Sequence, residues 1–439
     1  MKKPLVIMLL LLVASCFFGA CSNEATDSPD GTGIGRVTEV ETVYIGALFP
    51  SSGAQAELVA DLQAAMLVAA DIINNAHDIE WDMAQNAGLA NYGKAQVEIV
   101  FADCGVTAAS AREAAEQLIA QGVSIITGCY DSTLSEAVAE VCQKHNIPMI
   151  SGSAKEDKLT DGERTYAPVF NRIAMSSTLE TELFLTYLNQ YNLTTNAGIK
   201  KAAIAYINND YGNKAAENLE NRLLSSGLQV VAVISYEASS SDFTEPASKM
   251  IANAPDVIFQ ISSTADLIGF AQAYQGAAFT PALALCYTGG FQQDDFLSTA
   301  LDLGVEFYSG TIVCPDTLYD DGDAEKTDAK ETAADIFSYI NQLYRQQTHQ
   351  GMDTYAYLEF AAIIVAAQAV EAAGTTEPAA LNTALKETVF AAPYLFSGSI
   401  DFDEQGQNII EPGYIATIKE GRYQWSFSPV NVEQNSLTN

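Results

Sequence analysis

Short apolar runs alternate with longer stretches of helical periodicity along most of this 439-residue chain. Such alternation is typical of parallel sheets that carry helices on their faces. It runs through two similar series, one from residue 43 to about 150 and one from about 200 to 286, so the sequence predicts an α/β protein with two lobes of like topology. Strands are expected at 43–49, 96–102, 123–127, 147–150, 201–207, 230–234, 257–261 and 282–286, with helices at 56–75, 108–121, 133–145, 215–226, 243–254 and 265–275. From about 315 we expect a polar loop, helices near 333–347 and 357–373, and short strands near 399–402 and 413–419.

The N-terminus has the pattern of an export signal. Lys2 and Lys3 precede an uncharged, mostly apolar run at 5–18 that is too short for a stable transmembrane helix. Cys21, preceded by Gly-Ala and followed by polar residues, resembles the lipidated cysteine of bacterial lipoprotein signals. Cys16 is an alternative with a better-fitting preceding sequence, but it would leave two phenylalanines where a polar tether is expected. An ordinary secretory signal is a third alternative.

These features predict an extracytoplasmic protein that a lipid on Cys21 holds to the bacterial cell membrane. Residues 1–20 would be the signal peptide and 21–41 a flexible polar tether. A spanning helix is not expected, because no later apolar run approaches about 20 residues.

Composition argues against nucleic acid as a partner and against an enzyme. The net charge of −34 repels nucleic acid and anionic lipid head groups. The three histidines, His77, His145 and His349, are scattered and lie in no zinc-protease or serine-hydrolase motif. We therefore expect a binding protein without cofactor or metal. A secreted enzyme on a similar sheet and a purely structural surface protein are the alternatives from other classes.

Several stretches, in this order and spacing, resemble the periplasmic-binding-protein type I family in its branched-chain amino acid and amide branch. They are residues 45–53 (IGALFPSSG), 128–133 (GCYDST), 147–153 (IPMISGS), 166–172 (YAPVFNR), 209–212 (NDYG) and 396–406 (FSGSIDFDEQG). The resemblance covers roughly residues 42–427. It implies two lobes, each a mostly parallel sheet flanked by helices, with a small ligand bound in the cleft between them. Lobe one would comprise 42–170 plus 315–390, and lobe two 171–314 plus 391–430.

The resemblance also implies a role. Such lipoproteins are monomers that deliver a small polar solute, here an amino acid or a related amide or carboxylate, to an ABC permease. A hinge would close the lobes on the ligand, and the permease would recognise the closed form. The alternative is a receptor subunit that reports the ligand to a membrane signalling protein.

Candidate ligand-binding residues follow the ends of the expected strands. Ser132 and Thr133 stand where the family binds a ligand carboxylate at a helix N-terminus, although Ser132 could instead cap that helix. Ser153 and Ala154 follow the next strand, at the carboxyl edge where open α/β sheets bind ligands. Tyr211 matches the family's tyrosine of the second lobe, and Ser263 lies in a further contact zone.

One departure from the family puts the ligand in doubt. Amino-acid binders place a glutamate near the position where this chain has Thr288 and Gly289. A buried ammonium without a carboxylate would be costly. Asp131, Asp210 or Asp266 could substitute, and a non-amino carboxylate or amide stays open as the ligand.

The cysteines leave one question open. The resemblance implies a disulfide between loops comparable to those that hold Cys104 and Cys129, whereas the alternative is that both are small buried apolar residues. Cys142 and Cys286 have the pattern of such buried residues.

Overall fold

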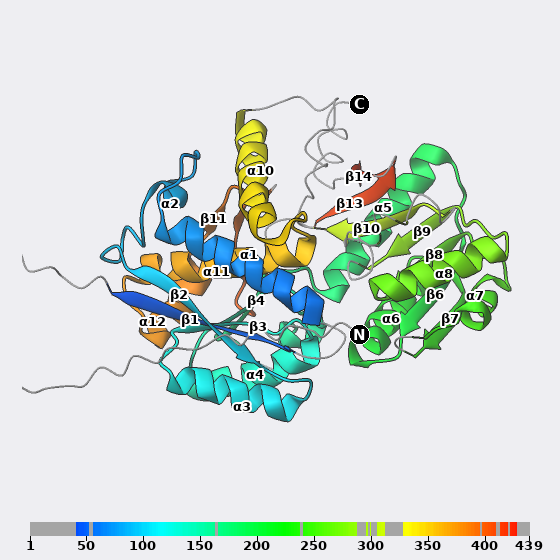
Figure 1. The fold of residues 1–439 in the computed structure, drawn as a ribbon. Helices are drawn as coiled ribbons and strands as arrows, with labels where there is room; N and C mark the ends of the chain where they lie inside the picture. The colour runs from blue at the N-terminus through cyan, green and yellow to red at the C-terminus, as the bar shows by residue number, and fades with distance from the viewer. Residues whose placement is uncertain are drawn as a thin grey trace, which may run out of the picture. The chain divides into compact units, whose positions relative to one another are not determined.

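The computed structural model describes residues 41–51, 56–162, 166–237, 240–287, 296, 299, 305–311, 328–395, 397–409, 413–419 and 422–427. Two parallel or mostly parallel sheets carry helices, as the alternating pattern predicts (Figure 1). The predicted α/β fold with sheets flanked by helices is confirmed. The cysteine proposed as lipid anchor, Cys21, lies outside the described residues, as do Thr288 and Gly289.

The first sheet is parallel, with strand order β2-β1-β3-β4-β5. Its strands alternate the faces of their side chains: Ile45 and Ala47 of β1 join one buried cluster, whereas Leu48 joins another. Helices α1 and α11 contribute to the first cluster, and α3 and α4 to the second, so both faces are covered (Figure 1). The strands are β1 (Thr42–Phe49), β2 (Gln96–Asp103), β3 (Ile125–Gly128), β4 (Met149–Ser151) and β5 (Phe170–Arg172). The helices that accompany them are α1 (Ala56–Asn74), α2 (Asp82–Gln85), α3 (Ala108–Ala120), α4 (Ser132–His145), α10 (Asp328–Thr348), α11 (Thr354–Ala373) and α12 (Pro378–Glu387).

The second sheet has the order β14-β13-β10-β9-β8-β6-β7. Its strands from β10 to β7 are parallel, and the C-terminal β13 and β14 add to the β10 side in antiparallel fashion. The strands are β6 (Lys201–Ile207), β7 (Gln229–Tyr236), β8 (Val257–Ile261), β9 (Leu283–Cys286), β10 (Phe307–Thr311), β13 (Tyr414–Lys419) and β14 (Arg422–Phe427). Its helices are α5 (Ser177–Thr195), α6 (Asp210–Ser225), α7 (Thr244–Ile251) and α8 (Thr264–Gly276), and the small elements η1 (Asp157–Leu159), β11 (Phe390–Ala392) and β12 (Gly398–Ile400) complete the chain.

Helix α11 is the central helix of the first lobe and corrects one expectation. It is long and apolar enough to cross a membrane by length and composition, contrary to the expectation that no later run reaches about 20 residues. Most of it is buried inside the protein, 78% of the apolar window, and its side chains pack against α1 and the first sheet. It is therefore placed as a core helix.

Two segments far apart in sequence run side by side where the chain leaves the first sheet. The guanidinium of Arg172, at the end of β5, is fully buried and donates to Gln407 Oε1 (2.8 and 2.7 Å) and to the Glu156 carbonyl (2.7 Å). The backbone N–H of Arg172 donates to the Gly406 carbonyl at 2.7 Å. These bonds fix the path of the chain between the two sheets.

The stretch after α12 packs differently from its expected place. Residues 391–430 were assigned to lobe two, whereas Tyr394, Ile400 and Phe402 lie in the buried cluster around α11. Strands β13 and β14, further on, extend the second sheet. The difference arises because the apolar side chains of Tyr394, Ile400 and Phe402 fill the core of the first lobe.

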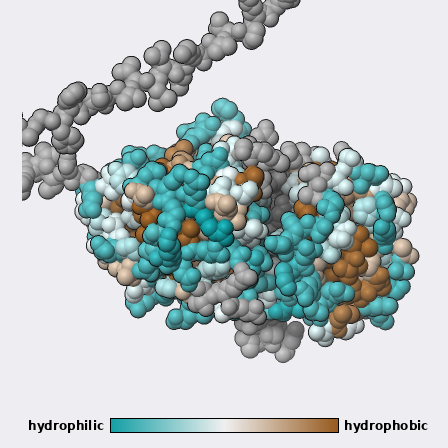
Figure 2. All heavy atoms as spheres, turned by 90° about the horizontal axis from the view of Figure 1, so that it is seen from below, coloured by the Kyte–Doolittle hydropathy of each residue, from teal (hydrophilic) through white to brown (hydrophobic). Residues whose placement is uncertain are grey.

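The surface agrees with the acidic composition. The face seen in Figure 2 is mostly hydrophilic, with smaller hydrophobic patches. With a net charge of −34, such a surface favours solubility.

Candidate functional site

The turn after β3 brings the first predicted residues to the carboxyl edge of the sheet. Asp131 caps α4, because its Oδ1 accepts the backbone N–H groups of Thr133 (2.8 Å) and Leu134 (3.0 Å). The cap is thus Asp131 and not Ser132. The exposed Thr133 hydroxyl has no hydrogen-bond partner among the described residues, so it is available to a ligand.

Ser132 joins two turns of the sheet edge. Its side chain is buried, and Oγ accepts the backbone N–H groups of Lys155 and Glu156, each at 3.2 Å. The hydroxyl keeps its own proton to donate. Ser132 therefore ties the turn after β3 to the turn after β4.

The turn after β4 holds Ser153 and Ala154. The Ser153 hydroxyl donates to Oε1 of Glu359 at 2.6 Å, and the Ala154 N–H donates to Ser151 Oγ at 3.1 Å. The backbone N–H of Ser153 has no partner among the described residues. Of this predicted pair, the free donor is thus a backbone amide and not the hydroxyl.

Glu359 is a buried carboxyl that sequence reasoning missed. It lies on α11 with no exposed surface, and burial raises its pKa to about 8, against the hydrogen bonds from Ser153 and the Gly152 backbone. Its Oε2 is buried and has no hydrogen-bond partner among the described residues. The signal in the sequence was a lone glutamate inside an alanine-rich apolar helix.

Three tyrosines gather near this edge. The rings of Tyr130 and Tyr355 are in edge-to-face contact with centroids 5.1 Å apart. Tyr211 lies in the first turn of α6, which Asn209 caps, and burial raises its pKa, with further contributions from Glu180 and Tyr130. Tyr211 thus interacts electrostatically with Tyr130 and Tyr355, two tyrosines that were not predicted.

A buried ion pair links the turn after β4 to a helix of the second sheet. Lys155 Nζ lies 3.0 Å from Glu180 Oε2 of α5, and both side chains are almost fully buried. Asp157 adds to this link by accepting the Ser177 hydroxyl (2.6 Å) and the Thr178 N–H (3.0 Å). The charges of Lys155 and Glu180 thus neutralise each other inside the protein.

The remaining predicted residues lie at the starts of helices α8 and α6. Ser263 caps α8 by accepting the Asp266 N–H, and Asp266 itself is buried, with its Oδ2 accepting the Tyr236 hydroxyl at 3.3 Å. Asp210, in contrast, is exposed beside Tyr211 in the first turn of α6.

The four described cysteines are buried and free. Cys104 and Cys129 interact with each other, and this interaction, together with burial, raises the pKa of Cys129. Cys142 and Cys286 are buried as expected. The thiols of Cys104 and Cys129 are thus adjacent without a bond between them.

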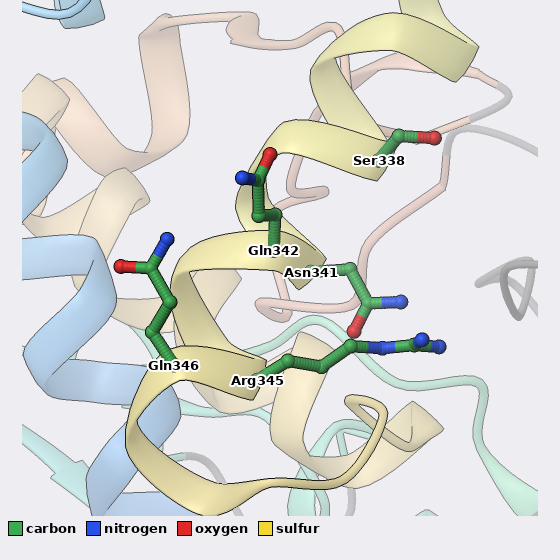
Figure 3. A pocket seen from close by; sticks show the side chains of 5 residues that line it. All are labelled: Ser338, Asn341, Gln342, Arg345 and Gln346. Carbon is green, nitrogen blue, oxygen red and sulfur yellow. The ribbon is translucent and has the colours of Figure 1, made fainter.

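A pocket of about 430 Å³ lies elsewhere, along one face of α10 (Figure 3). Polar side chains of this single helix line it: Ser338, Asn341, Gln342, Arg345 and Gln346. It contains none of the predicted ligand residues.

The fold and the sheet-edge site define a two-lobed binding protein. The family model described as periplasmic binding protein matches residues 42–422, and the chain belongs to this family. The expected family is therefore confirmed, and with it the expectation of a binding protein instead of an enzyme. Membership implies an extracytoplasmic location.

Individual relatives are distant in sequence. A curated relative is "Leu/Ile/Val-binding protein homolog 7" of Brucella abortus, 22% identical over 249 residues, or 57% of this chain and 59% of the relative. The match thus spans about three-fifths of that relative's length.

Solved structures share the fold across almost their whole length. The leucine-binding protein LivK of Thermotoga maritima has a TM-score of 0.69 at 16% identity, covering 89% of this chain and 99% of that one. The branched-chain amino acid binding protein LivJ of Streptococcus pneumoniae, in complex with isoleucine, has a TM-score of 0.67 at 19% identity, covering 87% and 98%. A solute-binding protein of Rhodopseudomonas palustris, in complex with 3,4-dihydroxybenzoic acid, has a TM-score of 0.69 at 17% identity, covering 88% and 96%.

Proposed function

We propose that this chain is the lipid-anchored solute receptor of an ABC importer and binds a small carboxylate-bearing ligand between its two lobes. The observation that carries the proposal is the set of unpartnered donors at the sheet edge: the Thr133 hydroxyl and the Ser153 backbone N–H. Hydrogen-bond donors without an acceptor suit an anionic ligand group. Tyr211 would close over the ligand from the second lobe.

The ligands of the structural neighbours support this chemistry. Leucine, isoleucine and 3,4-dihydroxybenzoic acid differ in their side groups and share a carboxylate. We propose that the carboxylate docks at Thr133 and Ser153 and that the remainder of the ligand meets Tyr130 and Tyr211. An amino acid, branched-chain-like in size, or a related amide or carboxylate fits this arrangement.

An amino-acid ligand would need a partner for its ammonium. Glu180 is already paired with Lys155, and the Asp131 Oδ1 is occupied by two amides of α4. The exposed Asp210 next to Tyr211 is the remaining candidate of the three aspartates expected from the sequence, since Asp266 is buried against Tyr236. We therefore assign Asp210 first in a search for the ammonium site.

A thermal-shift screen of the full chain in detergent tests the ligand. The panel holds leucine, isoleucine, valine, their amides, benzoate and hydroxybenzoates. A ligand at 100 times its dissociation constant stabilises the folded protein by about 2.7 kcal/mol. No shift with any of these compounds, after refolding to remove carried-over ligand, would overturn the receptor assignment.

Two variants then test the site. Thr133→Ala removes a hydrogen bond to a charged group and should weaken binding of the active compound by about 10- to 100-fold, or roughly 1.5–3 kcal/mol. Tyr44→Phe, which loses a hydroxyl on the exposed side of β1, is the matched control and should bind like the wild type. Equal affinity of both variants would place the ligand elsewhere.

Metabolic labelling with radioactive palmitate tests the anchor. We expect label on the wild type and on Cys16→Ser, and none on Cys21→Ser. Label that persists in Cys21→Ser and disappears in Cys16→Ser would move the anchor to Cys16.

A further inference from the structure

Glu359 places a carboxyl group directly beneath the turn that follows β4. It projects from α11, the core helix of the first lobe, and its side chain is fully buried. The Ser153 hydroxyl donates to its Oε1 at 2.6 Å. A residue of the core thus holds a residue of the proposed ligand site.

The turn is shaped to receive this carboxyl. A Cβ on Gly152 would lie 2.8 Å from both Cδ and Oε1 of Glu359, closer than real Cβ contacts occur. Gly152 therefore allows the close approach of the carboxyl to the turn. Two consecutive residues of the turn contact one side chain.

A purely structural role does not account for a glutamate here. Its Oε2 is buried without a partner, and a buried unpartnered polar atom costs free energy. An apolar side chain would avoid that cost in a helix whose neighbouring residues are apolar, such as Leu358 and Phe360. Helix α11 nevertheless carries a carboxyl group at the position that contacts the turn after β4.

The bond decides which donor of the turn faces a ligand. Because the Ser153 hydroxyl is directed at Glu359, the Ser153 backbone N–H is the donor left free. Releasing Ser153 would let its side chain rotate and let the peptide before it, which carries the free N–H, turn, whereas the peptide after it stays held by the Ala154 N–H on Ser151 Oγ. The direction of the free N–H thus depends on Glu359.

We propose that Glu359 is a positioning residue for ligand binding, which holds Ser153 so that its backbone N–H points to the ligand carboxylate. The proposal rests on the proposed function. It assigns the positioning of the Ser153 N–H to a buried residue of the core that does not itself contact the ligand. Ser153 then connects Glu359 to the ligand.

Protonation gives this role a signature. Burial makes the neutral acid the stable form at pH 7, and ionisation would place a charge in a site where Oε2 has no donor. The Cys129 thiol, from the turn after β3, interacts electrostatically with Glu359, and Cys129 in turn interacts with the free thiol of Cys104. The hydrogen bond from Ser153 acts to lower this pKa, so it is stronger to the ionised carboxylate, and the hold on Ser153 should therefore strengthen as the pH rises above about 8.

Hydrogen exchange of the full chain without ligand is the first test. Between pH 7 and 9, after correction for intrinsic rates, protection of the turn amides at 152–156 should rise about tenfold relative to β6. Glu359→Gln keeps an accepting oxygen and has no proton to lose, so its protection should stay constant. Glu371→Gln, on the same helix and partly exposed, is the matched control and should follow the wild type. A wild type without this dependence, or a Glu359→Gln protein that shares it, overturns the proposal.

Binding of leucine, measured calorimetrically, is the second test. Affinity should rise about tenfold from pH 7 to 9 in the Glu371→Gln protein and stay flat in Glu359→Gln, with any titration of leucine itself common to both. Ser153→Ala, which breaks the same bond from the other side, should also remove the dependence if Glu359→Gln folds poorly. Binding with identical pH profiles in all variants overturns the positioning role. Absence of leucine binding in every variant counts against leucine as the ligand in the proposed function, and the exchange experiment then decides the role of Glu359.

Discussion

Replacing Lys155 by Met should be among the most destabilising single changes in this chain. The Lys155 side chain is 7% exposed and that of Glu180 is fully buried, with Nζ and Oε2 3.0 Å apart. The Met variant keeps most of the apolar stem and removes the charge. It leaves the Glu180 carboxylate buried without its cation.

The magnitude follows from the burial and the distance. Two unit charges 3.0 Å apart attract each other by about 5 kcal/mol at an effective dielectric constant of about 20. Losing one partner of such a buried pair typically costs about 3–5 kcal/mol. Burial lowers the pKa of Lys155 despite the opposing effect of Glu180, so desolvation outweighs the attraction. Removing both charges, in Lys155→Met with Glu180→Met, should therefore cost much less than the single change.

Urea unfolding of the full chain measures both. We expect the midpoint to fall for Lys155→Met without a change in the denaturant slope, and to recover in the double variant. Lys249→Met breaks the exposed pair with Glu245 on α7 and should cost no more than about 0.5 kcal/mol. A loss below about 1 kcal/mol for Lys155→Met, or a double variant worse than the single one, would refute this reasoning.

Two further predictions concern stability. The pKa of Glu359 is raised from 4.5 to about 8 in the folded protein, so between these pH values the folded protein holds a proton that the unfolded chain has released. The free energy of unfolding should therefore fall across this window by up to about 1.4 kcal/mol per pH unit. Urea unfolding of Glu359→Gln from pH 5 to 8 should lack that slope. Gly406 has φ +88° and its Cβ would collide with the Phe170 carbonyl, whereas Gly398 has φ +69° and open space around it. Gly406→Ala should therefore cost at least about 2 kcal/mol more in a thermal melt than Gly398→Ala, which carries only the left-handed strain of about 1 kcal/mol, and equal losses would contradict this close approach.

The sequence predicted those elements whose periodicity is local. The strands of both series and the helices between them follow from alternating apolar runs, and their ends carry the turns at 128–133 and 151–154. Helix α5 was missed, although Ser176 caps it and Leu183, Phe184 and Tyr187 lie on its buried side. Its many threonines and asparagines obscured that stripe, because such residues are weak helix formers and favour turns.

The partners of the site residues could not be read from the sequence, because they are far apart along the chain. Ser153 and Glu359 are separated by more than two hundred residues, as are Arg172 and Gln407. Only the folding of α11 against the first sheet brings the glutamate to its turn. A glutamate in an apolar helix signals a buried carboxyl, but not which hydroxyl it holds.

The hydrogen bonds within the protein decide which polar groups of the predicted residues are left for a ligand. Hydroxyl groups at strand ends indicate a ligand site, yet Ser153 spends its hydroxyl on Glu359 and Ser132 accepts two amides. Among the described residues, this edge leaves open the exposed Thr133 hydroxyl, which can donate or accept, the proton of the Ser132 hydroxyl and the Ser153 backbone N–H, which only donates. A ligand group that only donates hydrogen bonds would leave the Ser153 N–H without an acceptor, whereas a carboxylate can accept from Ser153 and Thr133 at once. The Ser153 backbone N–H and the Thr133 hydroxyl therefore favour a ligand with a hydrogen-bond acceptor. Other residues of the candidate site would decide which ligand of this kind binds.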